Sequence, residues 1–357
     1  MKAFNVVAGF IIILCLGSVY AWSIFVPELK LNHGFNTTQT QLVFGVLIAS
    51  FTLTMVIAGR IYKKFGPQLV TLLSGLLFGL GYLLAGFSGG HFLWVFLGIG
   101  IIAGLGTGCG YLVSITNPVK WYPQRKGLVT GIAAAGFGLG AIVLTWLSKL
   151  LLESGSDVLE IFRIIGLSYG GVILIFSFFI KDPSSASAIV NPTPKVFKDK
   201  RFYKLFAGIF CGTFAGLLVI GNLKPMGGVY DINEETLLLG VSVFSAANFA
   251  GRLVWGWLSD YMSGRISIFV ALASLALFVF LMGYLQLSAT SYLILSVAIG
   301  FGFGANFVLF AKETAHLFGV EHMGNIYPFV FLGYGIAGIL GPDRKSTRLN
   351  SSHRYVS

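Results

Sequence analysis

Long apolar runs alternate with short polar loops along most of the chain. Each run approaches the length of about 20 residues that an α-helix needs to cross a bilayer. Only 10% of all residues are charged, whereas soluble domains keep about 25%. The chain is therefore expected to be an all-α membrane protein with about eleven transmembrane helices, at 6–26, 41–59, 69–88, 92–115, 128–150, 163–181, 203–223, 237–257, 267–286, 291–311 and 325–341.

An internal repeat divides these runs into two sets. Pairs of glycine motifs recur at an offset of 196 or 197 residues: Gly104–Tyr111 with Gly300–Phe307, Gly136–Gly138 with Gly333–Gly335, and Gly59 with Gly256. Two six-helix halves in parallel orientation, with the cargo site between them, are the arrangement of the major facilitator fold. By this symmetry a twelfth helix is expected after the last run. The polar segment 342–357 stands there instead and is interpreted as a non-native tail.

The repeat and the loops predict the domain organisation and the orientation. We expect an N-terminal six-helix bundle at 1–181, a cytoplasmic linker at 182–202 and an incomplete C-terminal bundle at 203–341. Cytoplasmic loops of membrane proteins carry an excess of Lys and Arg. With the N-terminus in the cytoplasm, fourteen of these residues fall in inside positions and four in outside positions. The net charge of +11 follows this pattern and indicates no nucleic-acid partner.

Arg252 is the most informative single residue. It precedes Asp260, which follows the run at 237–257 and is expected to end its helix, by eight residues, or about 12 Å of helix rise. A charge this deep in a span must face protein, water or a ligand, because exposure to lipid is costly. Its planar guanidinium matches a carboxylate, so we interpret it as a substrate clamp, with Asn248 one turn away on the same face. The alternative is a side chain that reaches to the interface or pairs with Asp260.

Further polar side chains in the apolar runs are candidates for substrate contacts. We expect hydrogen bonds to the substrate from Tyr20, Trp22, Tyr111, Asn222 and Tyr334, although aromatic residues near helix ends also anchor helices at the membrane interface. No Asp or Glu lies deep within a run, and proton-driven carriers usually need such a group. Exchange or facilitated movement is therefore favoured over proton coupling.

Two loops resemble the signature loop of the major facilitator superfamily, Gly-x-x-x-Asp-Arg-x-Gly followed by basic residues. One copy runs from Gly59 to Gly66, and the other starts at Gly256 and contains Asp260. The resemblance implies a conformational latch formed by charge contacts to a neighbouring helix. Lys63 stands at the aspartate position of the first copy, which departs from the pattern.

Four segments resemble the oxalate/formate antiporter family, within the wider monocarboxylate porter group: Gly17–Phe25, Lys120–Gly127, Ala250–Asp260 and Gly333–Pro342. The likeness covers most of the chain before residue 342. It implies that Arg252 is the substrate-binding arginine. The oxalate carrier of that family has a second cation, a lysine, where Tyr334 stands here, so a single charge favours a monocarboxylate. Proton-coupled monocarboxylate porters, which are less similar, place an aspartate directly before the arginine, where this chain has Gly251.

The function expected from the sequence is secondary transport of a small organic anion such as pyruvate, lactate or formate, with oxalate less favoured. Two alternatives share the fold: a membrane sensor that binds a carboxylate without moving it, and an exporter of other small molecules. An enzyme is not expected, because the sequence shows no nucleophile–base set and no metal-ligand cluster. No cofactor or metal is expected. We expect a monomer whose partners are lipid and a carboxylate, and the resemblance implies a bacterial inner membrane.

Overall fold

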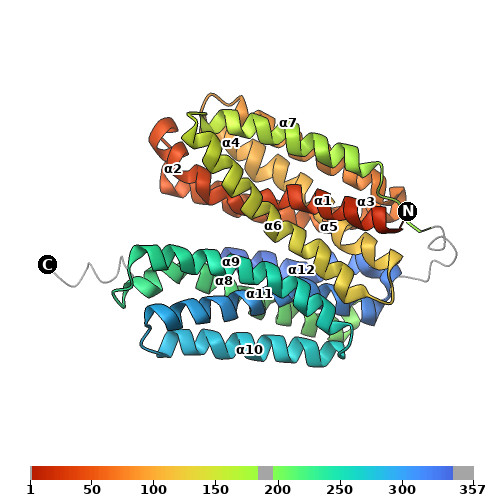
Figure 1. Cartoon of the computed structure of the whole chain (residues 1–357). Helices are drawn as coiled ribbons and strands as arrows, with labels where there is room; N and C mark the ends of the chain where they lie inside the picture. The colour runs from red at the N-terminus through yellow and green to blue at the C-terminus, as the bar shows by residue number, and fades with distance from the viewer. Residues whose placement is uncertain (1, 184–195, 341–357) are drawn as a thin grey trace.

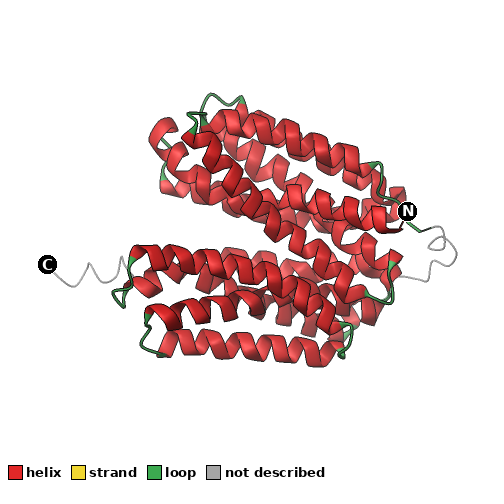
Figure 2. Cartoon of the chain, viewed as in Figure 1, coloured by secondary structure: helices red, strands yellow, loops and turns green. Residues whose placement is uncertain are grey.

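The computed structural model describes residues 2–183 and 196–340, and within these ranges the chain is helical with no strand (Figures 1 and 2). The predicted all-α membrane fold is confirmed. The N-terminal part contains α1 (Lys2–Leu16), α2 (Trp22–His33), α3 (Thr37–Gly86), α4 (Phe92–Val95), α5 (Gly104–Trp121), α6 (Lys126–Glu153) and α7 (Val158–Ser177). The C-terminal part contains α8 (Lys200–Gly228), α9 (Glu234–Ser259), α10 (Gly264–Tyr284), α11 (Ala289–Phe318) and α12 (Met323–Leu340).

Helix α3 contains two membrane spans. Ten helices among the described residues are long and apolar enough to cross a bilayer, and α3, with 50 residues, is the longest of them. Its backbone breaks at Gly66, whose φ of 81° and ψ of 174° no helix adopts, and Pro67 begins the next helical stretch. Glycine reaches positive φ without steric cost, and proline suits the first turn of a helix. Counting α3 twice gives the eleven spans expected from the runs.

Two of the expected helices are less regular than their runs predict. The run at 6–26 is interrupted by a 3₁₀ segment, Gly17–Ala21, between α1 and α2. The run at 92–115 passes through π-helical turns at Phe96–Ala103 before α5 begins. At Gly17 the α6 backbone lies so close that a Cβ would overlap the carbonyl of Phe137. Such local adjustments follow from contacts between helices, which hydropathy along the chain does not report.

The sequence repeat is also a repeat of packing. Helix α5 lies against α3 as α11 lies against α9. A Cβ on Gly108 would overlap the carbonyl of Phe51, and a Cβ on Gly304 would overlap the carbonyl of Asn248. Phe51 and Asn248 are themselves 197 positions apart. Small residues allow this close backbone approach in a membrane, where packing rather than the hydrophobic effect joins helices.

The helices form two bundles whose largest contacts with each other involve two pairs of helices. We call α1–α7 the N-terminal bundle and α8–α12 the C-terminal bundle (Figure 1). Helix α6 packs against α9, and α3 packs against α12. In Figure 1 the bundles lie closest at the end that carries the N-terminus and diverge toward the opposite end. The predicted tail at 342–357 and most of the predicted linker lie outside the described residues.

Candidate functional site

Arg252 projects from α9 into the contact between the two bundles. Its side chain is fully buried, with 0% of its surface exposed. Nε donates a hydrogen bond to Asn248 Oδ1 over 3.1 Å, and Nη1 donates one to the backbone carbonyl of Ala134 over 2.6 Å. Ala134 belongs to α6 of the N-terminal bundle. The guanidinium also lies 4.3 Å from the ring centroid of Phe307 in α11. The arginine therefore bridges the bundles rather than facing lipid.

The charge of Arg252 is incompletely satisfied. Nη2 has no hydrogen-bond partner within the part of the chain that the structure describes. None of the ion pairs between described residues includes Arg252. Burying an ion without a counter-ion costs several kcal/mol, on the order of 3–5 for a pair that has lost one partner. A guanidinium with one free N–H₂ group and no carboxylate is suited to receive an anion.

A group of tyrosines surrounds this guanidinium from both bundles. The hydroxyls of Tyr20 and Tyr334 are hydrogen-bonded to each other, so they join the 3₁₀ segment of the first span to α12. Tyr111 of α5 and Tyr327 of α12 are buried with their hydroxyls near each other, and neither forms a hydrogen bond of good geometry among the described residues. All four hydroxyls lie within electrostatic reach of Arg252.

The structure brings together most of the residues singled out from the sequence. We call the following set the arginine cluster: Arg252, Asn248, Tyr20, Tyr111, Tyr327, Tyr334 and Phe307. Two candidates lie outside it. Trp22 donates its indole N–H to the carbonyl of Thr40 and stacks on Phe162. Asn222 donates to the carbonyl of Leu218 in its own helix.

Sequence reasoning missed two aromatic members of the cluster and one backbone group. Tyr327 and Phe307 lie in apolar runs where aromatic residues are common, and nothing in their spacing distinguishes them from packing residues. The backbone carbonyl of Ala134 is a hydrogen-bond acceptor that a residue of any type would supply. The internal repeat provides one signal for Phe307. This residue lies 196 positions after Tyr111 and therefore occupies the equivalent place in the second half.

The cluster adjoins a tight crossing of α6 and α9. A Cβ on Gly131 would stand 2.6 Å from the carbonyl oxygen of Arg252, and a Cβ on Gly256 would stand 2.9 Å from Cα of Gly131. Both distances are shorter than real Cβ contacts, so only glycine fits at this crossing. The backbone that carries Arg252 is therefore held directly against the other bundle, and any separation of the bundles here displaces the arginine from Ala134.

Asp260, at the end of α9, stabilises the same crossing of α6 and α9 by hydrogen bonds. Its Oδ1 accepts the backbone N–H of Gly127 over 2.8 Å, and its Oδ2 accepts that of Leu128 over 2.9 Å. These amides open α6, where the helix dipole favours a negative charge. Lys312 of α11 approaches Oδ1 of Asp260 to 3.9 Å. The expected contact of the second signature loop with a neighbouring helix thus has a defined geometry between the bundles.

The first signature loop has a different arrangement. At Gly59 a Cβ would overlap the carbonyl of Gly324, so α3 and α12 cross here as α6 and α9 cross at Gly256. Gly66 provides the break between the two spans of α3. Lys63, rather than an aspartate, follows Gly59 by one turn. The two loops therefore share their glycine crossing but not their carboxylate.

A polar group lies near the same end of the N-terminal bundle. Oδ1 of Asp182 accepts hydrogen bonds from Lys120 at 2.9 Å, Asn117 at 3.0 Å and Tyr62 at 3.1 Å. This group joins the end of α7 to α3 and α5 and is separate from the arginine cluster. Among the described residues, no three His, Cys, Asp or Glu side chains are placed to hold a metal ion.

The sequence of the chain is similar to those of known transporters. The family model for the Major Facilitator Superfamily matches residues 7–342. The chain is 29% identical to the uncharacterized MFS-type transporter YhjX of Escherichia coli, over 91% of this chain and 82% of that protein. It is 27% identical to the oxalate:formate antiporter of Oxalobacter formigenes, over 93% and 81%. It is 26% identical to apicoplast pyruvate carrier 1 of Toxoplasma gondii, over 85% and 68%.

Solved structures show the same fold. The proton:xylose symporter XylE, bound to 6-bromo-6-deoxy-D-glucose, superposes with a TM-score of 0.68, covering 99% of this chain and 90% of that one. Its sequence identity is 12%, so the likeness concerns the arrangement of helices and not the ligand. The superposition thus shows that the two chains share their fold.

Proposed function

The chain belongs to the Major Facilitator Superfamily and is a secondary transporter, and we propose that its substrate is a small monocarboxylate anion. The observation that carries this proposal is the buried Arg252, which bridges the bundles and has an unpaired Nη2. A carboxylate placed there gains charge-assisted hydrogen bonds and relieves the cost of the buried charge. The names of the oxalate:formate antiporter and the pyruvate carrier support the same class of substrate.

The charge of the cluster favours one carboxylate over two. Arg252 is the cation whose charge acts on the four tyrosines of the cluster among the described residues. A dianion such as oxalate would leave one negative charge without a partner, which is costly in a site closed to water. The tyrosine hydroxyls supply neutral hydrogen bonds, which suit the keto or hydroxyl oxygen of pyruvate or lactate. We therefore expect formate-, pyruvate- or lactate-like anions to be transported in preference to oxalate.

Alternating access follows from the contacts between the bundles. The crossing at Gly256 and the contact from Asp260 to α6 hold one end closed. When the bundles rock apart at this end, Arg252 loses the carbonyl of Ala134, and a bound anion compensates for that loss. We place this end in the cytoplasm of a bacterial cell, from the excess of Lys and Arg on its loops. The structure is then closed at its cytoplasmic end.

The proposal favours exchange or facilitated movement over proton symport. No Asp or Glu contacts the arginine cluster among the described residues, and Gly251 stands directly before the arginine. Because the guanidinium of Arg252 stays protonated at all working pH values, the bundles separate more easily when a bound anion neutralises this buried charge. Exchange of one monocarboxylate for another keeps that charge neutralised in both directions.

Uptake into proteoliposomes tests the proposed substrate class. We expect vesicles containing the protein to accumulate labelled formate, pyruvate or lactate faster when they are preloaded with an unlabelled monocarboxylate. Oxalate is expected to compete weakly, and xylose and organic cations not at all. Protein-free vesicles provide the background. Transport of oxalate without any monocarboxylate, or binding of the anions without flux, would contradict the proposal.

Tyr334 is expected to determine the number of charges that the site accepts. Tyr334→Lys adds a second cation within reach of Arg252, so the ratio of oxalate to formate uptake should rise by about tenfold, equivalent to about 1.4 kcal/mol. Competition of the two anions in the same vesicles measures the ratio. Tyr334→Phe is the matched control, because it removes the hydroxyl bonded to Tyr20 without adding charge. An equal rise in both variants would show that the hydroxyl, and not the charge, sets the preference.

A further inference from the structure

Tyr62 lies in the contact between α3 and α12. A Cβ on Gly324 of α12 would stand 3.0 Å from Cδ1 of this ring, so the ring packs directly on the opposite bundle. At an offset of 197 residues, Tyr62 corresponds to Ser259 of α9, and Gly127 of α6 corresponds to Gly324. A Cβ on Gly127 would likewise overlap Oγ of Ser259. The two crossings therefore contain equivalent contacts, one through a small hydroxyl and the other through a large ring.

The Tyr62 ring is held in place by polar groups of its own bundle. Its hydroxyl donates a hydrogen bond to Oδ1 of Asp182 over 3.1 Å. Nζ of Lys120 in α5 lies 4.3 Å from the centroid of the ring and donates to both oxygens of Asp182, at 2.9 and 3.1 Å. Hydrogen bonds to a charged carboxylate are stronger than neutral ones. The ion pair of Lys120 and Asp182 therefore restricts the rotation of the ring that faces α12.

Asp182 is itself fixed, although it lies beyond the end of α7. The carbonyl of the preceding residue, Lys181, accepts hydrogen bonds from Nε1 of Trp121 and from Nδ2 of Asn5, each over 2.9 Å. These donors belong to α5 and α1. The chain that leaves α7 is thus bound to α1, α3 and α5 before the predicted linker continues. A carboxylate held from several sides can in turn hold the Tyr62 hydroxyl.

The carboxylates near the two crossings act in different ways. Asp260 reaches across to the other bundle, where the backbone N–H groups of α6 donate to it. Asp182 stays within its own bundle and reaches α12 through the Tyr62 ring. The repeat therefore conserves the packing of the crossing, whereas the charged group that supports it comes from another part of the chain.

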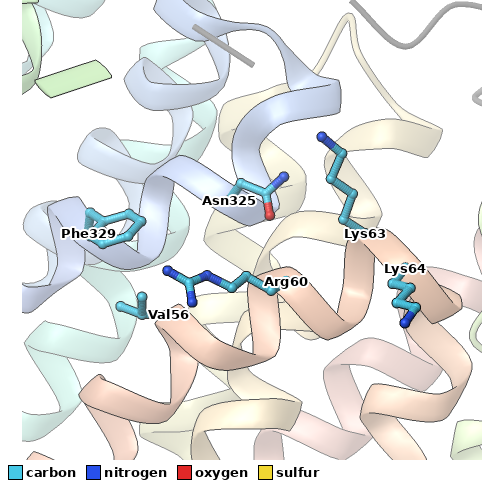
Figure 3. Close-up of a pocket in the computed structure, with 6 residues that line it drawn as sticks. All are labelled: Val56, Arg60, Lys63, Lys64, Asn325 and Phe329. Atoms are coloured by element: carbon cyan, nitrogen blue, oxygen red, sulfur yellow. The ribbon is translucent and has the colours of Figure 1, made fainter. Parts of the chain in front are cut away.

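An open cavity of about 570 Å³ lies beside the crossing of α3 and α12. It is lined by residues of both helices, among them Val56, Arg60, Asn325 and Phe329 (Figure 3). Because α3 and α12 do not pack tightly where the cavity lies, closure at this crossing depends more strongly on the contact of Tyr62 with Gly324.

We propose that Asp182 is a positioning residue for transport: by holding Tyr62 against α12, it stabilises the closed state of this crossing. When the bundles separate at this end, Gly324 moves away from the ring. The free energy of closure therefore depends on the orientation of the ring, which the pair of Lys120 and Asp182 sets. This role requires a transporter whose bundles separate here, and it does not depend on the substrate assigned to Arg252.

Distances between spin labels across the crossing test this role in the purified full chain, in lipid nanodiscs without substrate. Phe65→Cys and Glu321→Cys provide exposed positions on α3 and next to α12, with the exposed Cys211 replaced by serine. We expect Asp182→Asn and Tyr62→Phe each to raise the ratio of open to closed molecules by about tenfold. This change is expected when a hydrogen bond to a charged group is lost or weakened.

A double variant distinguishes positioning from a general loss of stability. If Asp182 acts through the ring, Tyr62→Phe/Asp182→Asn should shift the ratio no further than Asp182→Asn alone, because changes within one network are not additive. Asp182→Glu keeps the charge and should restore part of the closed population. Tyr62→Phe keeps the ring and removes one hydroxyl, so it provides a test even where the Asp182 variants fold poorly.

Two matched controls remove similar interactions far from the crossing. Tyr203→Phe removes an exposed hydroxyl of α8 that donates to the carbonyl of Phe197, and Glu153→Gln removes the partner of Lys149. Both should leave the distance distribution unchanged. An unchanged distribution in Tyr62→Phe, or single effects that add in the double variant, would overturn the proposal. Either result leaves the substrate class open to its own test, because uptake into proteoliposomes measures which anions are transported.

Discussion

Arg252→Ala is expected to lower monocarboxylate uptake by about a hundredfold or more while the protein still inserts into the membrane. The variant removes the hydrogen bonds to Asn248 and Ala134 and the only charge positioned for the anion within the described cluster. Truncating one partner of a buried charged pair costs about 3–5 kcal/mol, and each 1.4 kcal/mol is a factor of ten. Initial rates of uptake into proteoliposomes, normalised to incorporated protein, measure the loss.

Two further variants show whether the guanidinium itself is required. Arg252→Lys keeps a positive charge but loses the planar fork, so we expect uptake to fall nearly as far. Arg201→Ala is the matched control, because Arg201 also lies over an aromatic ring, that of Phe318, but is exposed and paired with Asp199. Its uptake should stay close to the parent level. Unchanged uptake in Arg252→Ala would remove this residue from the transport site.

Gly256→Val is expected to disrupt closure at the crossing of α6 and α9. A Cβ here would stand 2.9 Å from Cα of Gly131 and 2.7 Å from the carbonyl oxygen of Gly127, so the helices must move apart. Overpacking of this kind costs about 1–3 kcal/mol, which changes the ratio of two conformations by about 5- to 150-fold. Uptake should therefore fall, and the population open at this end should rise.

Spin labels placed beside the crossing measure that population. Arg125→Cys and Tyr261→Cys provide exposed positions on the two bundles, with the exposed Cys211 replaced by serine. We expect mainly short distances in the parent and a second, longer distance in Gly256→Val. Gly283→Val in α10 is the control, because a Cβ there meets nothing within 4 Å. A distance distribution identical in the two glycine variants would show that the crossing does not govern closure.

The fold could be predicted from the sequence because helices that span a membrane must satisfy their own backbone hydrogen bonds in lipid. The lengths of the apolar runs thus predicted the spans, including the two that α3 joins across Gly66. The repeat offset also anticipated packing, since the glycines that it aligns are the ones that touch neighbouring backbones. The 3₁₀ break at Gly17–Ala21 was not predictable, because it depends on the helix packed against it.

The candidate site could be predicted only in part, because its contacts depend on how the helices pack against one another. Arg252 was conspicuous, because an unpaired charge deep in a span has few explanations. Its partner is a backbone carbonyl, that of Ala134, which leaves no mark in the sequence. The polarity of Trp22 and Asn222 predicts substrate contacts, but polarity does not reveal which way a helix is rotated, and both side chains form hydrogen bonds within or next to their own spans.

Dipolar recoupling in solid-state NMR tests the central claim most directly, since it detects the contact between substrate and guanidinium. The protein is labelled with ¹⁵N at its arginine side chains, reconstituted in lipid and saturated with ¹³C-carboxylate pyruvate or formate. We predict a contact of about 4 Å between the carboxylate carbon and a guanidinium nitrogen, as expected for hydrogen bonds of ordinary length. This contact should disappear in Arg252→Lys. A bound carboxylate with no arginine contact, or a contact that persists in that variant, would contradict the account.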